Sequence, residues 1–155
     1  MRRRRAQKRD IKEDPKYNSD IIGNFVSIIM RDGKKTVAQK IIYDALDIVA
    51  ERTKSDPVKV FFDALENARP RLRVKPRRIG GATYQVPMEV TKPGGVSIAL
   101  RWMRDFSRTK KGKPMSAKLA DEIVAAYKNE GGVIKKKEDT HKMAESNKAF
   151  AHFKF

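Results

Sequence analysis

Hydrophobic residues recur at every third or fourth position through most of the chain, the spacing that places them on one face of an α-helix. The pattern predicts six helices, which begin near Asp20, Thr36, Pro57, Val96, Ser116 and Val133. Suitable N-terminal caps are Ser19 or Asp20, Thr36, Asp56 and Ser116. Helix ends are predicted at Gly33, Pro70, Arg108 and Gly131-Gly132. Most of the protein is therefore expected to be a helical bundle.

One segment departs from the helical period. Residues 72 to 90, LRVKPRRIGGATYQVPMEV, contain two strand-like runs rich in Val and Tyr on either side of Gly80-Gly81. A glycine pair between two such runs is a strong signal for a β-hairpin. The chain is therefore predicted to be mainly α, a six-helix bundle with a projecting two-stranded β-hairpin between the third and fourth helices and a basic N-terminal arm.

The loop of this hairpin decides which side chains share a face, because successive strand residues point to opposite sides. A two-residue turn at Gly80-Gly81 would pair Arg77 with Tyr84 and mix charged and apolar residues on both faces. A three-residue loop, Gly80-Gly81-Ala82, would separate them. Its apolar face would hold Leu72, Val74, Pro76, Val86, Met88 and Val90, and its basic face Arg71, Arg73, Lys75, Arg77, Thr83 and Gln85. Three-residue glycine loops with a bulge are common, so we expect this second register.

The charge is high and unevenly distributed. The 155 residues carry 36 Lys and Arg against 19 Asp and Glu, a formal net charge of +17. Residues 36–68 are net acidic, whereas residues 69–92 carry seven basic residues against Glu89 alone, and the first nine residues carry six basic residues and no acid. The second and third helices are therefore interpreted as scaffold. The hairpin and the arm are interpreted as the surface for a polyanionic partner, because such charge opposes folding unless a partner offsets it.

Other classes of function lack their sequence patterns. The chain has no cysteine, no Walker loop, no GxSxG and no HExxH, so neither an active site nor a cofactor or metal site is expected. The longest apolar run, FVSIIM, is too short to span a membrane. His141 and His152 are interpreted as ordinary polar residues and Trp102 as a packing residue. Phe150, Phe153 and Phe155 either fold back onto the bundle or stack on a partner.

Several segments together resemble a known family. DPKYNSDIIGNFVSIIMRDGKKT, FFDALENARPRLRVKPRRIGGATYQVPMEV, ALRWM and KKKEDTHKMAESNKAFAHFKF occur in the order found in the universal uS7 family of small-subunit ribosomal proteins. The resemblance covers essentially the whole chain. It implies a helical bundle with a projecting hairpin, direct binding to 16S rRNA, nucleation of the subunit head (the 3′ major domain) and a position near the exit-site tRNA. It also implies neighbouring head and platform proteins and a cytoplasmic location in the ribosome.

The resemblance and the charge pattern together give a set of expected rRNA contacts. They are Arg2, Arg3, Arg4, Arg5, Lys8, Arg9, Lys34, Lys35, Arg71, Arg73, Lys75, Arg77, Arg78, Tyr84, Arg101, Arg108, Lys110, Lys111 and Lys113. Tyr84 is included as a ring on which a base could stack. One departure from relatives, which commonly carry arginines there, is Gly94-Gly95, placed between the hairpin and the fourth helix.

A single domain over residues 1–155 is expected, with a flexible arm at 1–17, the hairpin at 71–91 and an aromatic-basic tail at 148–155. The alternative function is a β-ribbon regulator that binds DNA, since strands can also read DNA. An RNA-modifying enzyme is disfavoured because a cofactor loop or catalytic cluster is missing from the sequence.

Overall fold

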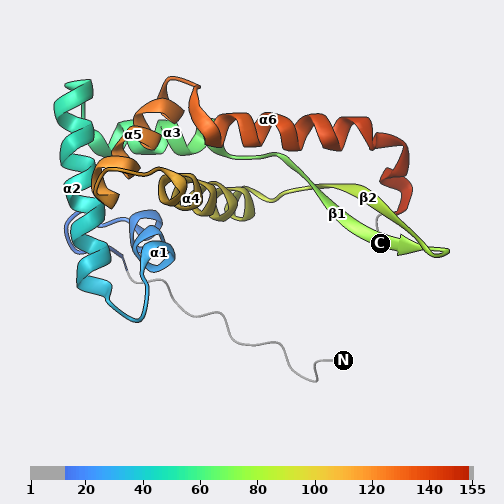
Figure 1. Ribbon diagram of the computed structural model, residues 1–155, viewed down its shortest axis with the longest axis horizontal. Helices are drawn as coiled ribbons and strands as arrows, with labels where there is room; N and C mark the ends of the chain where they lie inside the picture. The colour runs from blue at the N-terminus through green and yellow to red at the C-terminus, as the bar shows by residue number, and fades with distance from the viewer. Residues whose placement is uncertain (1–12, 154–155) are drawn as a thin grey trace.

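A computed structural model gives the fold and describes residues 13–153 (Figure 1). The bundle helices are α1 (Asp20–Ile29), α2 (Lys35–Thr53), α3 (Pro57–Ala68), α4 (Lys92–Thr109), α5 (Met115–Tyr127) and α6 (Gly131–Ser146). The strands β1 (Leu72–Ile79) and β2 (Ala82–Glu89) lie between α3 and α4. A short 3₁₀-helix, η1 (Lys148–Phe153), follows α6. The predicted fold class is confirmed, and within residues 13–153 the structure adds η1 to the six predicted helices.

Helix α5 is the central element of the bundle, since it packs against α2, α3, α4 and α6. Its buried residues Leu119 and Ile123 meet the apolar faces of α2 and α3, whose own buried residues follow the predicted stripes. The rings of Phe25 in α1 and Phe61 in α3 stack at 5.5 Å between centroids. Trp102 is a half-buried residue packed against this core, as expected. The second and third helices thus contribute much of the buried core.

Four helix starts differ from the predicted ones. Helix α2 begins at Lys35 rather than Thr36, and α5 begins at Met115 rather than after Ser116. Helix α6 begins at Gly131 rather than Val133. The largest difference is α4, which begins at Lys92, four residues before Val96, with a proline in its first turn. In contrast, Asp56 caps α3 as predicted, because its carboxylate accepts the backbone N–H of Val58 at 3.0 Å.

Gly94 and Gly95 therefore lie inside the first turn of α4, not between the hairpin and the helix as predicted. A Cβ atom at Gly95 would lie 2.9 Å from the carbonyl oxygen of Pro70 and 2.7 Å from the side chain of Arg69. Such distances leave no room for a side chain, so glycine lets α4 pack directly on the segment that leads into β1. Glycine at position 95 therefore has a packing reason.

The predicted hairpin register is wrong. Strand β1 pairs with β2 through a two-residue turn at Gly80-Gly81, so that Arg77 lies opposite Tyr84 and Lys75 opposite Val86. Both glycines have positive φ, 57° and 89°, which is the backbone that a type I′ turn requires and that suits the twist of the strands. Ala82 is the first residue of β2 rather than part of the loop. Charged and apolar residues therefore share both faces of the hairpin.

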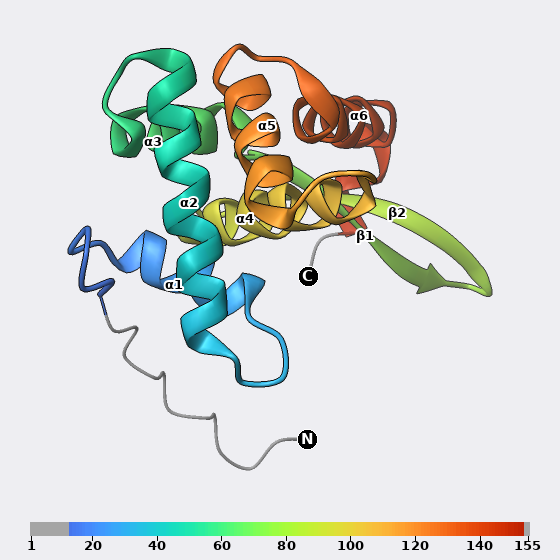
Figure 2. The ribbon, with the colours of Figure 1, turned by 60° about the vertical axis from the view of Figure 1, so that its left-hand side comes forward.

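The hairpin projects away from the bundle, and the C-terminal segment accompanies it (Figures 1 and 2). Helix α6 contacts both strands, and η1 contacts β2. Val86 is fully buried although it lies opposite the exposed Lys75. Tertiary contacts with α6 and η1 thus supply the burial that an isolated two-stranded ribbon would lack.

The predicted arm is partly folded at its C-terminal end. Asp14 is 2% exposed, and its carboxylate accepts hydrogen bonds from the backbone N–H groups of Lys16 and Tyr17 and from the Tyr43 hydroxyl of α2 at 2.8 Å. Residues 14–17 therefore belong to the bundle. The predicted flexibility of residues 1–12 concerns a segment outside the described residues.

Candidate nucleic-acid interface

Two basic regions lie at the two ends of α4. The hairpin leads into the first residue of α4, whereas the last turn of α4 reaches a pocket between α1, α2 and α5 (Figure 1). Helix α4 has 18 residues, so at 1.5 Å per residue it spans about 27 Å. A polyanion that followed α4 would meet cations at both ends.

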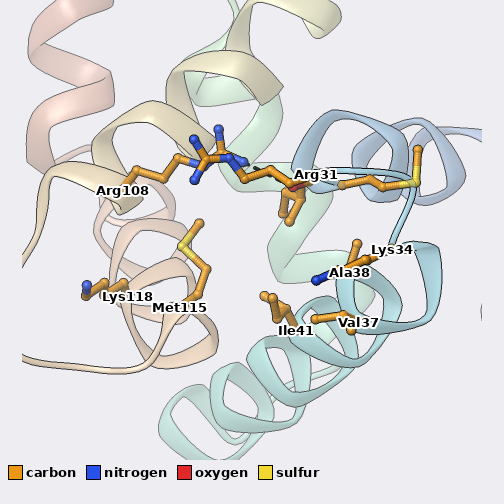
Figure 3. A pocket seen from close by; sticks show the side chains of 10 residues that line it. Arg31, Lys34, Val37, Ala38, Ile41, Arg108, Met115 and Lys118 are labelled. Atoms are coloured by element: carbon orange, nitrogen blue, oxygen red, sulfur yellow. Dashed lines mark hydrogen bonds between the residues drawn. The ribbon is translucent and has the colours of Figure 1, made fainter.

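The pocket at the C-terminal end of α4 has a volume of about 520 Å³ (Figure 3). Its lining is formed by Ile29, Met30, Arg31, Lys34, Val37, Ala38, Ile41, Arg108, Met115 and Lys118. Figure 3 shows the Arg108 side chain extending toward Arg31, with Met115, Ile41 and Val37 on one side of them. The apolar floor comes from α2 and α5, and the four cations come from three separate parts of the chain. Its lining residues include no carboxylate.

Several positive charges lie close together at this pocket. The pKa of the Arg108 guanidinium is lowered, first by burial and then by the neighbouring charges of Arg104 and Arg31. Arg108 also donates a hydrogen bond from Nη2 to the carbonyl oxygen of Ile29, at 3.1 Å, in the last turn of α1. Like charges held this close repel one another, so a bound anion would relieve the repulsion.

Sequence reasoning found Lys34 and Arg108 but missed the rest of this pocket. Val37 fits the hydrophobic spacing of the second helix, yet it is 53% exposed. Met115 was not singled out in the sequence. Arg31 and Lys118 carried no sequence signal beyond their charge. The pocket forms only when α1, α2, α4 and α5 come together, so periodicity alone does not reveal it.

The cations of the hairpin differ in their exposure. Arg71, Lys75 and Arg78 are exposed, whereas Arg73 and Arg77 are half-buried. The Nε atom of Arg73 is buried, and no hydrogen-bond partner for it is found among the described residues. The side chain of Arg73 therefore has an unused donor at the base of the hairpin.

Tyr84 was expected to stack on a base, but its ring packs within the protein. Its centroid lies 5.0 Å from that of Phe150 and 5.7 Å from that of Phe153, both in η1. The two phenylalanines themselves stack at 6.3 Å. Of the two alternatives for the aromatic tail, Phe150 and Phe153 fold back within the protein, but onto the hairpin rather than onto the bundle. Phe155 lies outside the described residues.

Several predicted contact residues already have partners within the chain. Lys110 pairs with the buried carboxylate of Glu122, with 2.6 Å between Nζ and Oε2. Lys113 pairs with Asp121 at 3.1 Å, and Arg101 donates to the hydroxyl of Ser97 at 2.9 Å. Lys35 and Lys111 are exposed. Arg2, Arg3, Arg4, Arg5, Lys8 and Arg9 lie outside the described residues.

His141 was interpreted as an ordinary polar residue, but it holds the base of the hairpin. Its Nε2 atom accepts the backbone N–H of Arg71 at 3.0 Å and, more weakly, that of Leu72 at 3.4 Å. Only the spatial meeting of α6 with the start of β1 reveals this role, because 70 positions separate the two residues.

Within residues 13–153, no group of three or more His, Cys, Asp or Glu side chains is placed to hold a metal ion. No helix in this part of the chain has the length and apolar character needed to cross a membrane.

Comparison with known proteins agrees with the architecture. Residues 1–148 match the family described as ribosomal protein S7p/S5e. The small ribosomal subunit protein uS7 of Thermotoga maritima is 57% identical over 155 residues, which cover the full length of both chains. The proteins of the same name from Thermosipho africanus and Desulfatibacillum aliphaticivorans are 52% and 53% identical, over 100% and 99% of each chain. The chain therefore belongs to the ribosomal protein S7p/S5e family, as its resemblance to uS7 implied, and is a ribosomal protein rather than an enzyme.

Proposed function

We propose that this protein is a structural component of the small ribosomal subunit that binds 16S rRNA directly. Its binding would nucleate assembly of the subunit head, and the protein would lie near the exit-site tRNA. Full-length similarity to proteins named for the small ribosomal subunit supports the assignment to that particle. The observation that carries the binding role is the basic-rimmed pocket at one end of α4, with the basic hairpin at the other.

The proposed interface includes the predicted cations that the structure leaves accessible and two that it adds. These are Lys34, Lys35, Arg71, Lys75, Arg78, Arg101, Arg108 and Lys111, together with Arg31 and Lys118. Lys110 and Lys113 are expected to contribute less, because their charges already face carboxylates. The arm residues from Arg2 to Arg9 remain part of the proposal on their charge alone.

The pocket has the chemistry to receive one unstacked nucleotide of the RNA. Val37, Ile41 and Met115 offer an apolar floor for the face of a base. Arg31, Lys34, Arg108 and Lys118 surround this floor with positive charge that suits the adjoining phosphates. Proteins that bind RNA specifically often take up unstacked bases in this way while cations hold the backbone.

The binding proposal is tested by footprinting the purified protein on full-length 16S rRNA, with duplex DNA as a competitor. Met115→Glu places a negative charge in the pocket and is expected to weaken binding about tenfold or more, since it opposes phosphate contact and base burial. Met143→Glu is the matched control, because Met143 is 47% exposed on α6 and lies outside the pocket lining. Equal binding of both variants would exclude the pocket, and preferential binding to duplex DNA would favour the DNA-binding alternative.

The assembly role requires a separate experiment. The 3′ major domain of 16S rRNA is mixed with the other head proteins, with or without this protein. Omission is expected to leave the other proteins poorly bound, because a nucleating protein must order the RNA first. Normal binding of the other proteins after omission would contradict the assembly role without affecting direct binding.

A further inference from the structure

Residues 69–71 connect α3 to the hairpin and are here called the joint. Helix α6 contacts the chain on both sides of this joint. The Nζ atom of Lys137 donates to the carbonyl oxygen of Asn67 in the last turn of α3, at 2.7 Å. One helical turn later, Nε2 of His141 accepts the backbone N–H groups of Arg71 and Leu72. Residues four positions apart lie on the same face of a helix, so this face of α6 contacts the chain just before and just after the joint.

The joint sets the direction in which the hairpin leaves the bundle. The carbonyl oxygen of Arg71 accepts the N–H of Val90 at 2.9 Å, which extends the pairing of the two strands to the base of the hairpin. The backbone N–H of Arg71 therefore bonds to His141 of α6, and its carbonyl oxygen bonds to Val90, directly after β2. Release of the N–H would remove the hydrogen bonds that hold the hairpin base to His141, while the packing of α6 on both strands remains.

Only the neutral form of His141 can make this contact. A ring nitrogen that accepts a hydrogen bond carries no proton, whereas both ring nitrogens of an imidazolium are donors. The surroundings favour the neutral form, since the pKa of His141 is lowered from 6.5, first by burial and then by the positive charges of Lys137 and Arg71. Backbone N–H groups pointing at the ring add to the same preference.

Charged groups from every neighbouring element line the two hollows beside His141. They are Glu66 of α3, Arg69 directly after α3, Arg71 before β1, Glu89 of β2, Lys137 and Glu145 of α6, and Lys148 of η1. Glu66 and Arg69 pair with each other. The remaining three cations outnumber the two carboxylates, so the group as a whole does not stabilise an imidazolium.

We propose that His141 is a positioning residue for RNA recognition, whose neutral imidazole fixes the hairpin in its binding orientation and whose protonation releases it. The predicted effect on affinity rests on the proposed binding of 16S rRNA. The structural half of the proposal, that neutral His141 fixes the hairpin, concerns the free protein alone. The protein would thus lose affinity for RNA under mildly acidic conditions through a change in the protein itself. A population of misdirected hairpins lowers the apparent affinity in proportion to the fraction still correctly placed.

The structural half is tested by NMR on the free protein. The amide signals of Arg71 and Leu72 are followed from pH 7.5 to pH 5, together with the ring signals of His141. We expect these amides to shift with the His141 ring and to exchange faster with solvent once it is protonated. His141→Phe, which keeps a ring but has no acceptor, is expected to show the exposed amides at every pH. Unchanged protection of both amides in His141→Phe would overturn the proposal.

The functional half is tested by measuring the affinity for 16S rRNA across the same pH range at constant salt. Wild type is expected to lose about threefold to tenfold in affinity as His141 is protonated, the equivalent of one hydrogen bond to the backbone. His141→Gln has an amide oxygen that can accept and does not titrate, so its affinity is expected to vary much less with pH. His152→Gln alters the only other histidine, which is exposed in η1, and is expected to behave as wild type.

These variants separate the possible failures. A pH dependence in His141→Gln equal to that of wild type would assign the effect to the RNA or to other groups and overturn the proposal. If neither wild type nor any variant binds 16S rRNA at any pH, the proposed function fails. The amide measurements on the free protein still decide the role of His141. If His141→Phe does not fold, the wild-type titration and His141→Gln decide it.

Discussion

Lys110 and Glu122 form an ion pair that connects the loop before α5 to the middle of that helix. The Nζ and Oε2 atoms are 2.6 Å apart, and Glu122 is 2% exposed. The second carboxylate oxygen accepts the backbone N–H of Val133, at 3.2 Å, near the start of α6. One buried carboxylate therefore joins three elements, and Lys110, expected to bind RNA, completes its environment.

Loss of this lysine is expected to affect folding more than RNA binding. Lys110→Ala would leave Glu122 buried without its counter-ion and should lower the free energy of unfolding by roughly 1–3 kcal/mol. This loss is smaller than for a fully buried ion pair, because the lysine is partly exposed. Lys111→Ala is the matched control, since Lys111 is the exposed neighbour. Urea denaturation of both variants gives the comparison. Equal stabilities would show that the ion pair contributes nothing measurable.

The corrected hairpin register makes a second prediction about two residues that face each other. Val86 is fully buried and Lys75 is exposed, although they pair across the strands. Val86→Ala should lower the free energy of unfolding by roughly 1–3 kcal/mol through lost burial and a small cavity. Lys75→Ala should change stability by less than about 0.5 kcal/mol and weaken RNA binding. Thermal unfolding and an RNA-binding assay on each variant measure both effects, and the reverse ranking would contradict the burial of Val86 and the exposure of Lys75.

A third prediction concerns the salt dependence of RNA binding. Each phosphate contact removed should reduce the slope of log K against log salt concentration by about 0.7–0.9. Lys34→Ala and Lys118→Ala, at the rim of the pocket, should each show such a reduction. Lys135→Ala, an exposed residue of α6 outside the pocket lining, should leave the slope unchanged. Titrations at several salt concentrations test this, and three identical slopes would place the RNA elsewhere.

A fourth prediction concerns alkaline pH. Burial and the carboxylate of Asp14 raise the pKa of Tyr43 from 10.0 to about 12. The folded state therefore retains this proton more tightly than the unfolded state, so its contribution is complete below pH 10 and is lost as the pH rises toward 12. Tyr43→Phe should lower stability by about 1–2 kcal/mol at pH 8, as expected for a half-buried hydrogen bond to a carboxylate.

The two proteins should therefore become more similar in stability between pH 10 and pH 11.5. Urea denaturation of wild type and Tyr43→Phe at each pH isolates this contribution, since the two proteins differ only at residue 43. A difference in stability that stayed constant over the range would mean that Tyr43 does not titrate with folding.

A fifth prediction tests the packing of the tail on the hairpin. Phe150→Ala should remove the ring contact with Tyr84 and increase amide exchange along β2 and η1, because the short ribbon depends on such support. Lys148→Ala is a suitable control, as Lys148 is exposed in the same 3₁₀-helix. Exchange that increased equally in both variants would show only general fraying of the chain end.

The sequence by itself determined the order and type of the elements and the high positive charge. Hydrophobic spacing of three and four predicts α1 to α6 because one face of each helix must be buried, and that requirement is local. Asp56 before Pro57 is likewise a local signal, because its carboxylate accepts the backbone N–H of Val58, two positions along the chain. The family was also readable, since it depends on the identity and order of residues along the chain.

Tertiary structure decided the faces and partners of these elements. Gly80 and Gly81 were recognised as turn residues, but the sequence left open whether the loop has two or three residues. The positive φ of both glycines in the folded chain corresponds to the two-residue turn. Tyr84 meets Phe150 and Phe153, and Arg71 meets His141, across 66 or more positions that carry no periodic signal. The pocket with Arg31 and Met115 forms only where four helices converge. Long-range packing assigns such contacts, because a residue's local pattern specifies the face that it lies on but not the partner that covers that face.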